Sequence, residues 1–303
     1  MADLFENPLG TDGFEFVEFT SPEPETLEAL FTQLGFTPVA KHKTRDITRF
    51  KQGDITFLVN REQTGQAAEF RKAHGPSANA MAFRVADAKK AYADALKRGA
   101  ESYDEGVWTD AETVPAIKGI GGSVLYLVDK YHGETIYDDA FEPIPGAEDT
   151  GGAGLEVLDH LTHNVHHGNM DTWAGFYEDV FNFREIRYFD IQGQHTGLLS
   201  RAMTGPCGKL KIPLNESSDD QSQIAEYLRE YNGEGIQHIA LTTSNIYETV
   251  EQLRAQGVIF QGTPETYYEL VDERVPGHGE DLERLKKNNI LVDGDPENGD
   301  GLL

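Results

Sequence analysis

The sequence is short of cysteine, of basic residues and of long apolar runs. Cysteine occurs once among the 303 residues, at Cys207, so an internal disulfide is impossible and the chain suits a reducing compartment. Lys and Arg together number 26 against 52 Asp and Glu, which gives a formal charge of −26. Because such a field repels phosphate backbones, we expect no nucleic-acid partner.

Signals for membrane insertion and export are missing as well. No apolar run approaches the length that crosses a bilayer. The first ten residues carry Asp3 and Glu6 among isolated apolar side chains, unlike a secretory leader. We therefore expect a soluble, cytoplasmic protein without a membrane partner. A hydrophobic fraction of 38% is sufficient for real cores, and the length allows two domains or one large one.

Strand and helix signals recur in both halves of the chain. Phe14-Glu-Phe-Val-Glu-Phe-Thr alternates apolar and polar residues like a half-buried strand, and Leu27, Leu30 and Phe31 follow at helical spacing. A shift of 158 residues places Ala80 on His238. The pattern indicates an α+β protein in which one strand–helix–strands unit is repeated, each half forming a curved sheet with helices outside.

The segment from Glu142 to Gly154 is the most strongly punctuated part of the chain by Pro and Gly, so we place a linker there. We expect an N-terminal structural and assembly domain over residues 1–150 and a C-terminal catalytic domain over residues 151–303. This division rests on the metal-type histidines, which the pattern places in the second half.

Glycines in Gly119-Ile-Gly-Gly invite comparison with a phosphate-binding loop. Such a loop follows a strand and opens a helix. Here the glycines precede the β-type run from Val124 to Val128, so a tight turn before a strand is the better interpretation.

Two histidines occupy positions where a buried strand normally carries an aliphatic residue. They are His160, in Leu155-Glu-Val-Leu-Asp-His-Leu-Thr, and His238, in Gly235-Ile-Gln-His-Ile-Ala-Leu. Either alone is typical of a core histidine held by hydrogen bonds. Together, in equivalent elements, they favour half of a metal site, since a facial-triad iron centre takes two imidazoles and one carboxylate. His163 falls on the opposite face of its strand from His160, and His166 and His167 fall in the loop that follows.

Polar residues also occupy strand-like sites between and beside the histidines. Inward polar groups need partners, which a substrate can supply. Each alone is typical of a surface or turn position, and only their combination with the histidines makes them candidates. They are Ser200, Asn215, Gln223 and Gln237.

Several co-linear motifs resemble the 4-hydroxyphenylpyruvate dioxygenase family across almost the whole chain. They are Pro115-Ala-Ile-Lys-Gly-Ile-Gly-Gly, Asp159-His-Leu-Thr-His-Asn-Val, Arg187-Tyr-Phe-Asp-Ile, Ile212-Pro-Leu-Asn-Glu, Gly233-Glu-Gly-Ile-Gln-His and Pro264-Glu-Thr-Tyr-Tyr-Glu. The resemblance implies the vicinal oxygen chelate fold, built from paired βαβββ units as half-open barrels.

The same resemblance implies a function and a set of site residues. His160 and His238 would bind Fe(II), and Ser200, Asn215, Gln223 and Gln237 would contact the substrate. The reaction would convert 4-hydroxyphenylpyruvate and O2 into homogentisate and CO2, in tyrosine catabolism. The family's habit implies a homo-oligomer.

The sequence departs from the family at its end. The family takes its third iron ligand, a glutamate, from a Phe-Phe-Glu strand that this chain does not contain. The chain stops at Leu303, where Leu302 would begin the next strand. We therefore expect an incomplete second barrel and little or no turnover by the printed chain. The alternatives are 4-hydroxymandelate synthase, against which Pro213 and Asn215 lean, and a truncated, non-catalytic scaffold.

Overall fold

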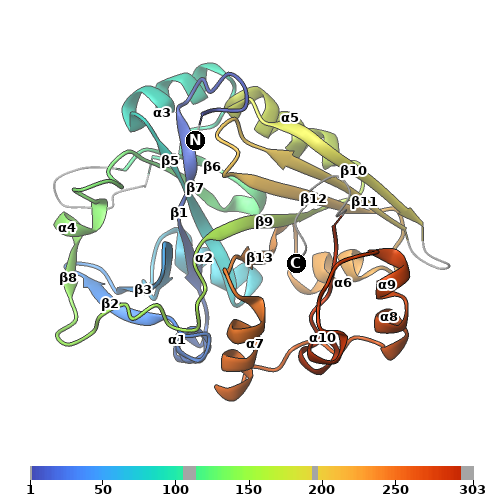
Figure 1. The fold of residues 1–303 in the computed structure, drawn as a ribbon. Coiled ribbons are helices and arrows are strands. Elements are labelled where there is room, and N and C mark those ends of the chain that lie inside the picture. The colour runs from blue at the N-terminus through green and yellow to red at the C-terminus, as the bar shows by residue number, and fades with distance from the viewer. Residues whose placement is uncertain (1, 105–113, 193–196, 295–303) are drawn as a thin grey trace.

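Two β-sheets lie side by side in the computed structural model, which describes residues 2–104, 114–192 and 197–294 (Figure 1). The first sheet has eight strands and the second has five, with helices packed around them. This arrangement is the α+β class that the sequence predicts. Within the described ranges, no helix is both long and apolar enough to cross a membrane.

The first half of the chain builds the eight-stranded sheet, in the order β6-β7-β5-β1-β4-β3-β2-β8. Helix α1 begins with a proline in its first turn and Glu25 beside it, and α3 is capped by the Asp87 side chain. Its elements are β1 (Thr11–Thr20), α1 (Pro24–Gln33), β2 (Thr37–His42), β3 (Ile47–Gln52), β4 (Ile55–Asn60), α2 (Gln66–His74), β5 (Ser77–Val85), α3 (Ala88–Lys97), β6 (Ala116–Lys118), the 3₁₀ turn η1 (Ile120–Gly122), β7 (Val124–Val128), α4 (Ile136–Ala140) and β8 (Phe141–Pro143).

The second half builds the five-stranded sheet, in the order β10-β11-β12-β9-β13. Helices α7 to α10 form a separate small apolar cluster beyond that sheet. The elements are β9 (Leu158–Val165), α5 (Met170–Phe181), β10 (Arg184–Gln192), β11 (Gly197–Thr204), β12 (Lys211–Ser217), α6 (Gln223–Glu230), β13 (Gly235–Leu241), α7 (Ile246–Ala255), α8 (Glu265–Glu269), α9 (Val271–Arg274) and α10 (Leu282–Asn288).

The predicted repeat is confirmed by the strand pairing. In the first sheet β1 pairs in parallel with β4 and antiparallel with β5. In the second sheet β9 pairs in parallel with β12 and antiparallel with β13. The shift of 158 residues carries Ala88–Lys97 of α3 onto Ile246–Ala255 of α7. Among the described residues neither sheet closes into a barrel, and the strand expected at Leu302 lies outside them.

One apolar core joins the two halves. Phe14 and Phe83 of the first sheet belong to the same buried cluster as Leu161 of β9 and Phe181 of α5, and α3 lies beside α5 (Figure 1). Most residues of the expected linker are exposed, but its end is anchored: Ala153 is buried, and its N–H donates to Gln52 Oε1 at 2.6 Å. The two halves of the chain therefore share a core. The division into domains 1–150 and 151–303 with separate roles stays a prediction.

The glycine-rich turn is a tight turn before β7, as predicted. Gly121 has a φ of +60°, and a Cβ added there would lie 2.0 Å from the carbonyl oxygen of Glu234. Only glycine allows this approach. The turn therefore brings the first half against the start of β13.

Candidate metal centre

Two neighbouring antiparallel strands, β9 and β13, bring the two candidate histidines together. The Nε2 atoms of His160 and His238 lie 3.4 Å apart. The hydroxyl of Thr162, which pairs with His238 across the ladder, lies 2.9 Å from His238 Nε2. The side chain of His160 is 27% exposed, so the pair lies at an accessible face of the sheet.

Each histidine sits beside a β-bulge in the β9–β13 ladder. On β13 the pairing steps from Ile236 to His238, so that Gln237 is the extra residue. On β9 it steps from His160 to Leu158 against one residue of β13, so that Asp159 is the extra residue. A bulge twists its strand and re-aims a side chain. Both extra residues consequently reach the ring of the histidine next to them.

These bulge residues fix the orientation of both imidazoles. Asp159 Oδ2 lies 2.8 Å from His160 Nδ1, and Gln237 Oε1 lies 2.5 Å from His238 Nδ1. A carboxylate and an amide oxygen can only accept, so each Nδ1 is the N–H donor. In the neutral rings both Nε2 atoms then carry a lone pair, and that of His238 can accept from the Thr162 hydroxyl 2.9 Å away. A cation bound between the two Nε2 atoms would be stabilised by both lone pairs.

The ionisation of the site agrees with this arrangement. The hydrogen bond from His160, together with Lys211, lowers the pKa of Asp159 to about 2 against the opposing effect of burial. The pKa of His238 is lowered by burial and then by the charge of His160. A neutral imidazole is the form that binds a metal ion.

The residues present fit a divalent metal ion. Nitrogens that share an ion at about 2.0–2.1 Å lie somewhat more than 3 Å apart, close to the 3.4 Å between these Nε2 atoms. A hydrogen-bonded Nδ1–H behind each ligating nitrogen is the usual outer shell of such sites. The part of the chain that the structure describes contains no group of three or more His, Cys, Asp or Glu side chains placed to hold a metal.

Two of the predicted substrate residues lie in a row that extends from the histidines across the sheet. Ser200 pairs with Asn215, and Asn215 pairs with Asn164 of β9. Because side chains alternate along a strand, Asn164 shares the face of His160 and Thr162. The Oδ1 atom of Asn164 is buried without a hydrogen-bond partner in the described part of the chain. This row offers polar groups with spare bonding capacity.

The other two predicted substrate residues are placed differently. Gln223 is exposed in the first turn of α6. Gln237 is also exposed, but its side-chain oxygen is occupied by His238 Nδ1. In the structure Gln237 orients the ring of His238. Its contact with the substrate stays a prediction.

The remaining histidines of the cluster are placed as the strand period predicts. His163 is fully buried on the core face, where its Nε2 lies 2.7 Å from the Tyr177 hydroxyl. Burial lowers its pKa to about 3. His166 and His167 are exposed at the end of β9.

The sequence interpretation gave no role to Asp159, Thr162 or Lys211. Lys211 Nζ donates to Asp159 Oδ1 at 2.6 Å, so the carboxylate behind His160 is held from two sides. Asp159 precedes His160 directly, and neighbours on a regular strand face opposite ways. Only the bulge brings them together, and the sequence carries no plain signal of a bulge.

Comparison with known proteins agrees with this geometry. Residues 5–142 match the family described as hydroxyphenylpyruvate dioxygenase, HPPD, N-terminal. Residues 157–270 match the glyoxalase/bleomycin resistance protein/dioxygenase superfamily. The second match begins just before β9, the strand that carries His160.

Among curated proteins, 4-hydroxyphenylpyruvate dioxygenase of Pseudomonas aeruginosa is 56% identical over 98% of this chain and 84% of its own length. Hemolysin VllY of Vibrio vulnificus is 57% identical over 98% of this chain and 85% of its own. 4-Hydroxyphenylpyruvate dioxygenase of Legionella pneumophila strain Corby is 51% identical, again over 98% of this chain and 84% of its own.

Two solved structures have the same fold. A xylose isomerase-like TIM barrel/4-hydroxyphenylpyruvate dioxygenase fusion protein superposes with a TM-score of 0.81 and 32% identity, over 96% of this chain and 46% of that one. A mutant of 4-hydroxymandelate synthase from Streptomyces coelicolor has a TM-score of 0.79 at 23% identity, over 94% and 85% of the two chains. With relatives this similar over nearly its whole length, the chain belongs to the 4-hydroxyphenylpyruvate dioxygenase family.

Proposed function

We propose that the chain is an Fe(II) dioxygenase that converts 4-hydroxyphenylpyruvate and O2 into homogentisate and CO2. The observation that carries the proposal is the approach of the two Nε2 atoms to 3.4 Å, with each ring held through its Nδ1 by a side-chain acceptor. Family membership supplies the reaction class. His160 and His238 would hold the iron, which when bound supplies the oxygen-activating redox chemistry.

The protein's own groups would bind and orient the substrate. The row of Asn164, Asn215 and Ser200 runs along the face that carries the histidines, so a flat aromatic 2-oxo acid could lie across the strands. The unpartnered Asn164 Oδ1 can accept a hydrogen bond from the substrate's hydroxyl. Gln223, on α6, would contact the substrate from the edge of this face.

The remaining parts of the proposal concern setting and assembly. We place the protein in the cytoplasm, in tyrosine catabolism, and as a homo-oligomer in which the first half of the chain serves assembly. The single cysteine and the family membership support this setting. A third protein ligand, a carboxylate, would complete the facial triad, so iron binding and turnover have to be measured separately.

The test is oxygen uptake by the purified chain with Fe(II), ascorbate and 4-hydroxyphenylpyruvate, with products identified and iron content measured on the same sample. His238→Ala is the loss variant, and His166→Ala, which alters an exposed histidine outside the pair, is its control. Homogentisate and CO2 formed in step with O2 consumption support the proposal. Hydroxymandelate as the product would assign the synthase reaction instead. Bound iron without uptake would agree with the low turnover expected from the missing third ligand and would favour the alternative, a metal-binding scaffold.

A further inference from the structure

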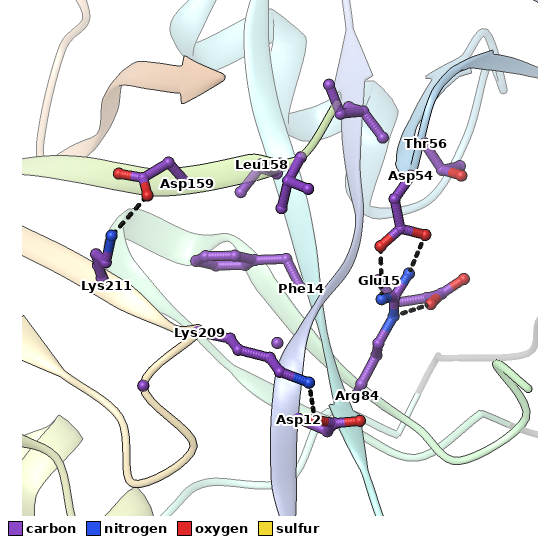
Figure 2. A pocket seen from close by; sticks show the side chains of 14 residues that line it. Asp12, Phe14, Glu15, Asp54, Thr56, Arg84, Leu158, Asp159, Lys209 and Lys211 are labelled. Carbon is purple, nitrogen blue, oxygen red and sulfur yellow. Dashed lines mark hydrogen bonds and ion pairs between the residues drawn. The ribbon is translucent and has the colours of Figure 1, made fainter. Parts of the chain in front are cut away.

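A cavity of about 350 Å³ is lined by residues of both sheets, among them Asp159, the neighbour of His160 in the sequence (Figure 2). The carboxylates in its wall are paired with basic side chains. Arg84 binds Glu15 and Asp54, Lys209 binds Asp12, and Lys211 binds Asp159. The last of these pairs differs from the others because the same carboxylate also accepts from His160.

Asp159 uses its two oxygens for two different purposes. Oδ2 accepts from His160 Nδ1 at 2.8 Å, and Oδ1 accepts from Lys211 Nζ at 2.6 Å. The two bonds fix the plane of the carboxylate and with it the direction of the imidazole. Charge-assisted bonds of this kind are shorter and stronger than neutral ones. His238, by contrast, is held by the neutral amide of Gln237.

We propose that Asp159 and Lys211 are positioning residues for the metal ligand His160. The inference rests on the proposed function, since it concerns the same metal site. Asp159 keeps the proton of His160 on Nδ1, which leaves Nε2 unprotonated. Lys211 fixes the orientation of the Asp159 carboxylate by binding its other oxygen. Both act through His160 and need no contact with the metal or the substrate.

The first sheet contains a natural comparison. Glu15 is the extra residue of a bulge on β1, where the pairing steps from Phe16 to Phe14, and it binds Arg84 in the same cavity. The neighbouring residue there is Phe16, which has no nitrogen to orient. An acid paired with a base at this bulge is therefore compatible with a purely structural role. What distinguishes Asp159 is the additional bond to an imidazole.

The test compares Asp159→Ala, Asp159→Asn and Lys211→Met with Lys209→Met in the full chain. Lys209 is a matched control because it lines the same cavity, has a side chain 48% exposed against 42% for Lys211, and likewise binds an aspartate. Two properties are measured. The ¹⁵N shifts of the His160 ring in the metal-free chain report its tautomer, and an anaerobic titration with Fe(II) gives the dissociation constant.

The wild-type chain and Lys209→Met should both show a single Nδ1–H tautomer of His160. Asp159→Ala should show a mixture of tautomers and bind Fe(II) about 10–100-fold more weakly, as is usual when an outer-shell partner is lost. Asp159→Asn keeps an acceptor but loses the ion pair, so it should fall between the two. Lys211→Met should weaken binding less than Asp159→Ala and more than Lys209→Met.

Unchanged tautomer and unchanged affinity in Asp159→Ala would overturn the inference while leaving the proposed function standing. Equal effects of Lys211→Met and Lys209→Met would overturn the role given to Lys211. If the folded wild-type chain binds no Fe(II), the proposed function fails and the metal part of this inference fails with it. The tautomer measurement then still decides whether Asp159 orients His160.

Discussion

The two sheets have the same strand pairing around β1 and β9 but carry different side chains at two equivalent positions. His160 pairs with Ala240 in the second sheet as Phe16 pairs with Ala82 in the first, and His238 pairs with Thr162 as Ala80 pairs with Glu18. Both positions of the histidine pair therefore exist twice in the fold. In the first half they hold a phenyl ring and a methyl group, and in the second half two imidazoles.

The bulges are retained in both halves. Each ladder has an extra acid beside the first position of the pair and an extra amide beside the second, and the β1–β5 ladder has one further register shift, between Thr11 and Phe14. These residues are Glu15 and Asn79 in the first sheet, and Asp159 and Gln237 in the second. The local backbone that aims a side chain at a ligand position thus belongs to the repeated unit. Metal binding requires in addition that imidazoles stand beside the bulges.

In the first sheet the two equivalent positions, Phe16 and Ala80, are buried. Phe16 is fully buried in an apolar cluster with Leu58 and Tyr126. The buried Glu18 carboxylate accepts from Asn79 at 2.7 Å and from Asn60 at 2.9 Å. The amide nitrogens of Asn60 and Asn79 are thus bonded to Glu18, while Asn79 Oδ1 is buried without a partner among the described residues. The pair of imidazoles therefore distinguishes the second sheet from the first, since each sheet has a buried amide oxygen without a partner among the described residues.

The largest expected effect comes from removing one imidazole from the second sheet. His160→Phe should weaken Fe(II) binding by roughly 10²–10³-fold, because structural metal sites with four ligands bind with about 10–16 kcal/mol, or about 3 kcal/mol per ligand. Anaerobic titration measures the change. His166→Ala should bind as the wild type does, and equal losses in both variants would mean that the pair at β9 and β13 is not the site.

The reciprocal change tests the first sheet. Phe16→His should lower the free energy of unfolding by about 3 kcal/mol, since it replaces a buried ring by a polar one without a hydrogen-bond partner prepared for it. Chemical denaturation of the metal-free protein measures this. His160→Phe, at a partly exposed position, should change it by about 1 kcal/mol or less. Similar losses in both variants would contradict the contrast between a buried and a partly exposed position.

The free energy of unfolding should fall in acid because His163 is buried. Its pKa is lowered from 6.5 to about 3. Between these pH values His163 is protonated in the unfolded chain and neutral in the folded chain. The contribution of His163 is complete above pH 6.5 and is lost as the pH falls from 6.5 towards 3, by at most about 1.4 kcal/mol per pH unit. His163→Gln should flatten the fall in stability between pH 7 and pH 5. A slope equal to that of the wild type would show that His163 titrates normally.

The smallest expected effect concerns Glu18 in the first sheet. Burial raises its pKa above 4.5, so its contribution to stability is complete below pH 4.5 and is lost as the pH rises through the folded pKa. Glu18→Gln keeps an oxygen for Asn60 and Asn79 and removes the charge. The stability of the variant relative to the wild type should therefore increase between pH 4.5 and pH 8. A stability difference between the variant and the wild type that shrinks over this pH range would contradict the raised pKa of Glu18.

Much of the fold could be predicted because its signals are periodic. The alternation around Phe14 and the 158-residue shift that joins Ala80 to His238 indicated the repeated unit, and the structure has it. The same alternation placed His163 opposite His160. The extent of contact between the halves could not be predicted, since the apolar pattern of a strand does not say which half covers it.

The two candidate ligands could be singled out from the sequence, whereas the residues that orient their rings could not. His160 and His238 stand out as imidazoles in apolar strands, which is a signal in the residue types themselves. Asp159 and Gln237 act through bulges, which break the two-residue period on which strand prediction rests. Lys211 reaches Asp159 from another strand, and only the three-dimensional pairing shows it.

The central claim is that the second sheet, and not the first, holds iron between His160 and His238. Anomalous X-ray diffraction at the iron edge, on crystals of the Fe(II)-loaded chain, tests it most directly. The account predicts one strong peak within bonding distance of both Nε2 atoms and none beside Phe16 and Ala80. Iron bound elsewhere, with the two imidazoles still facing each other 3.4 Å apart, would contradict it.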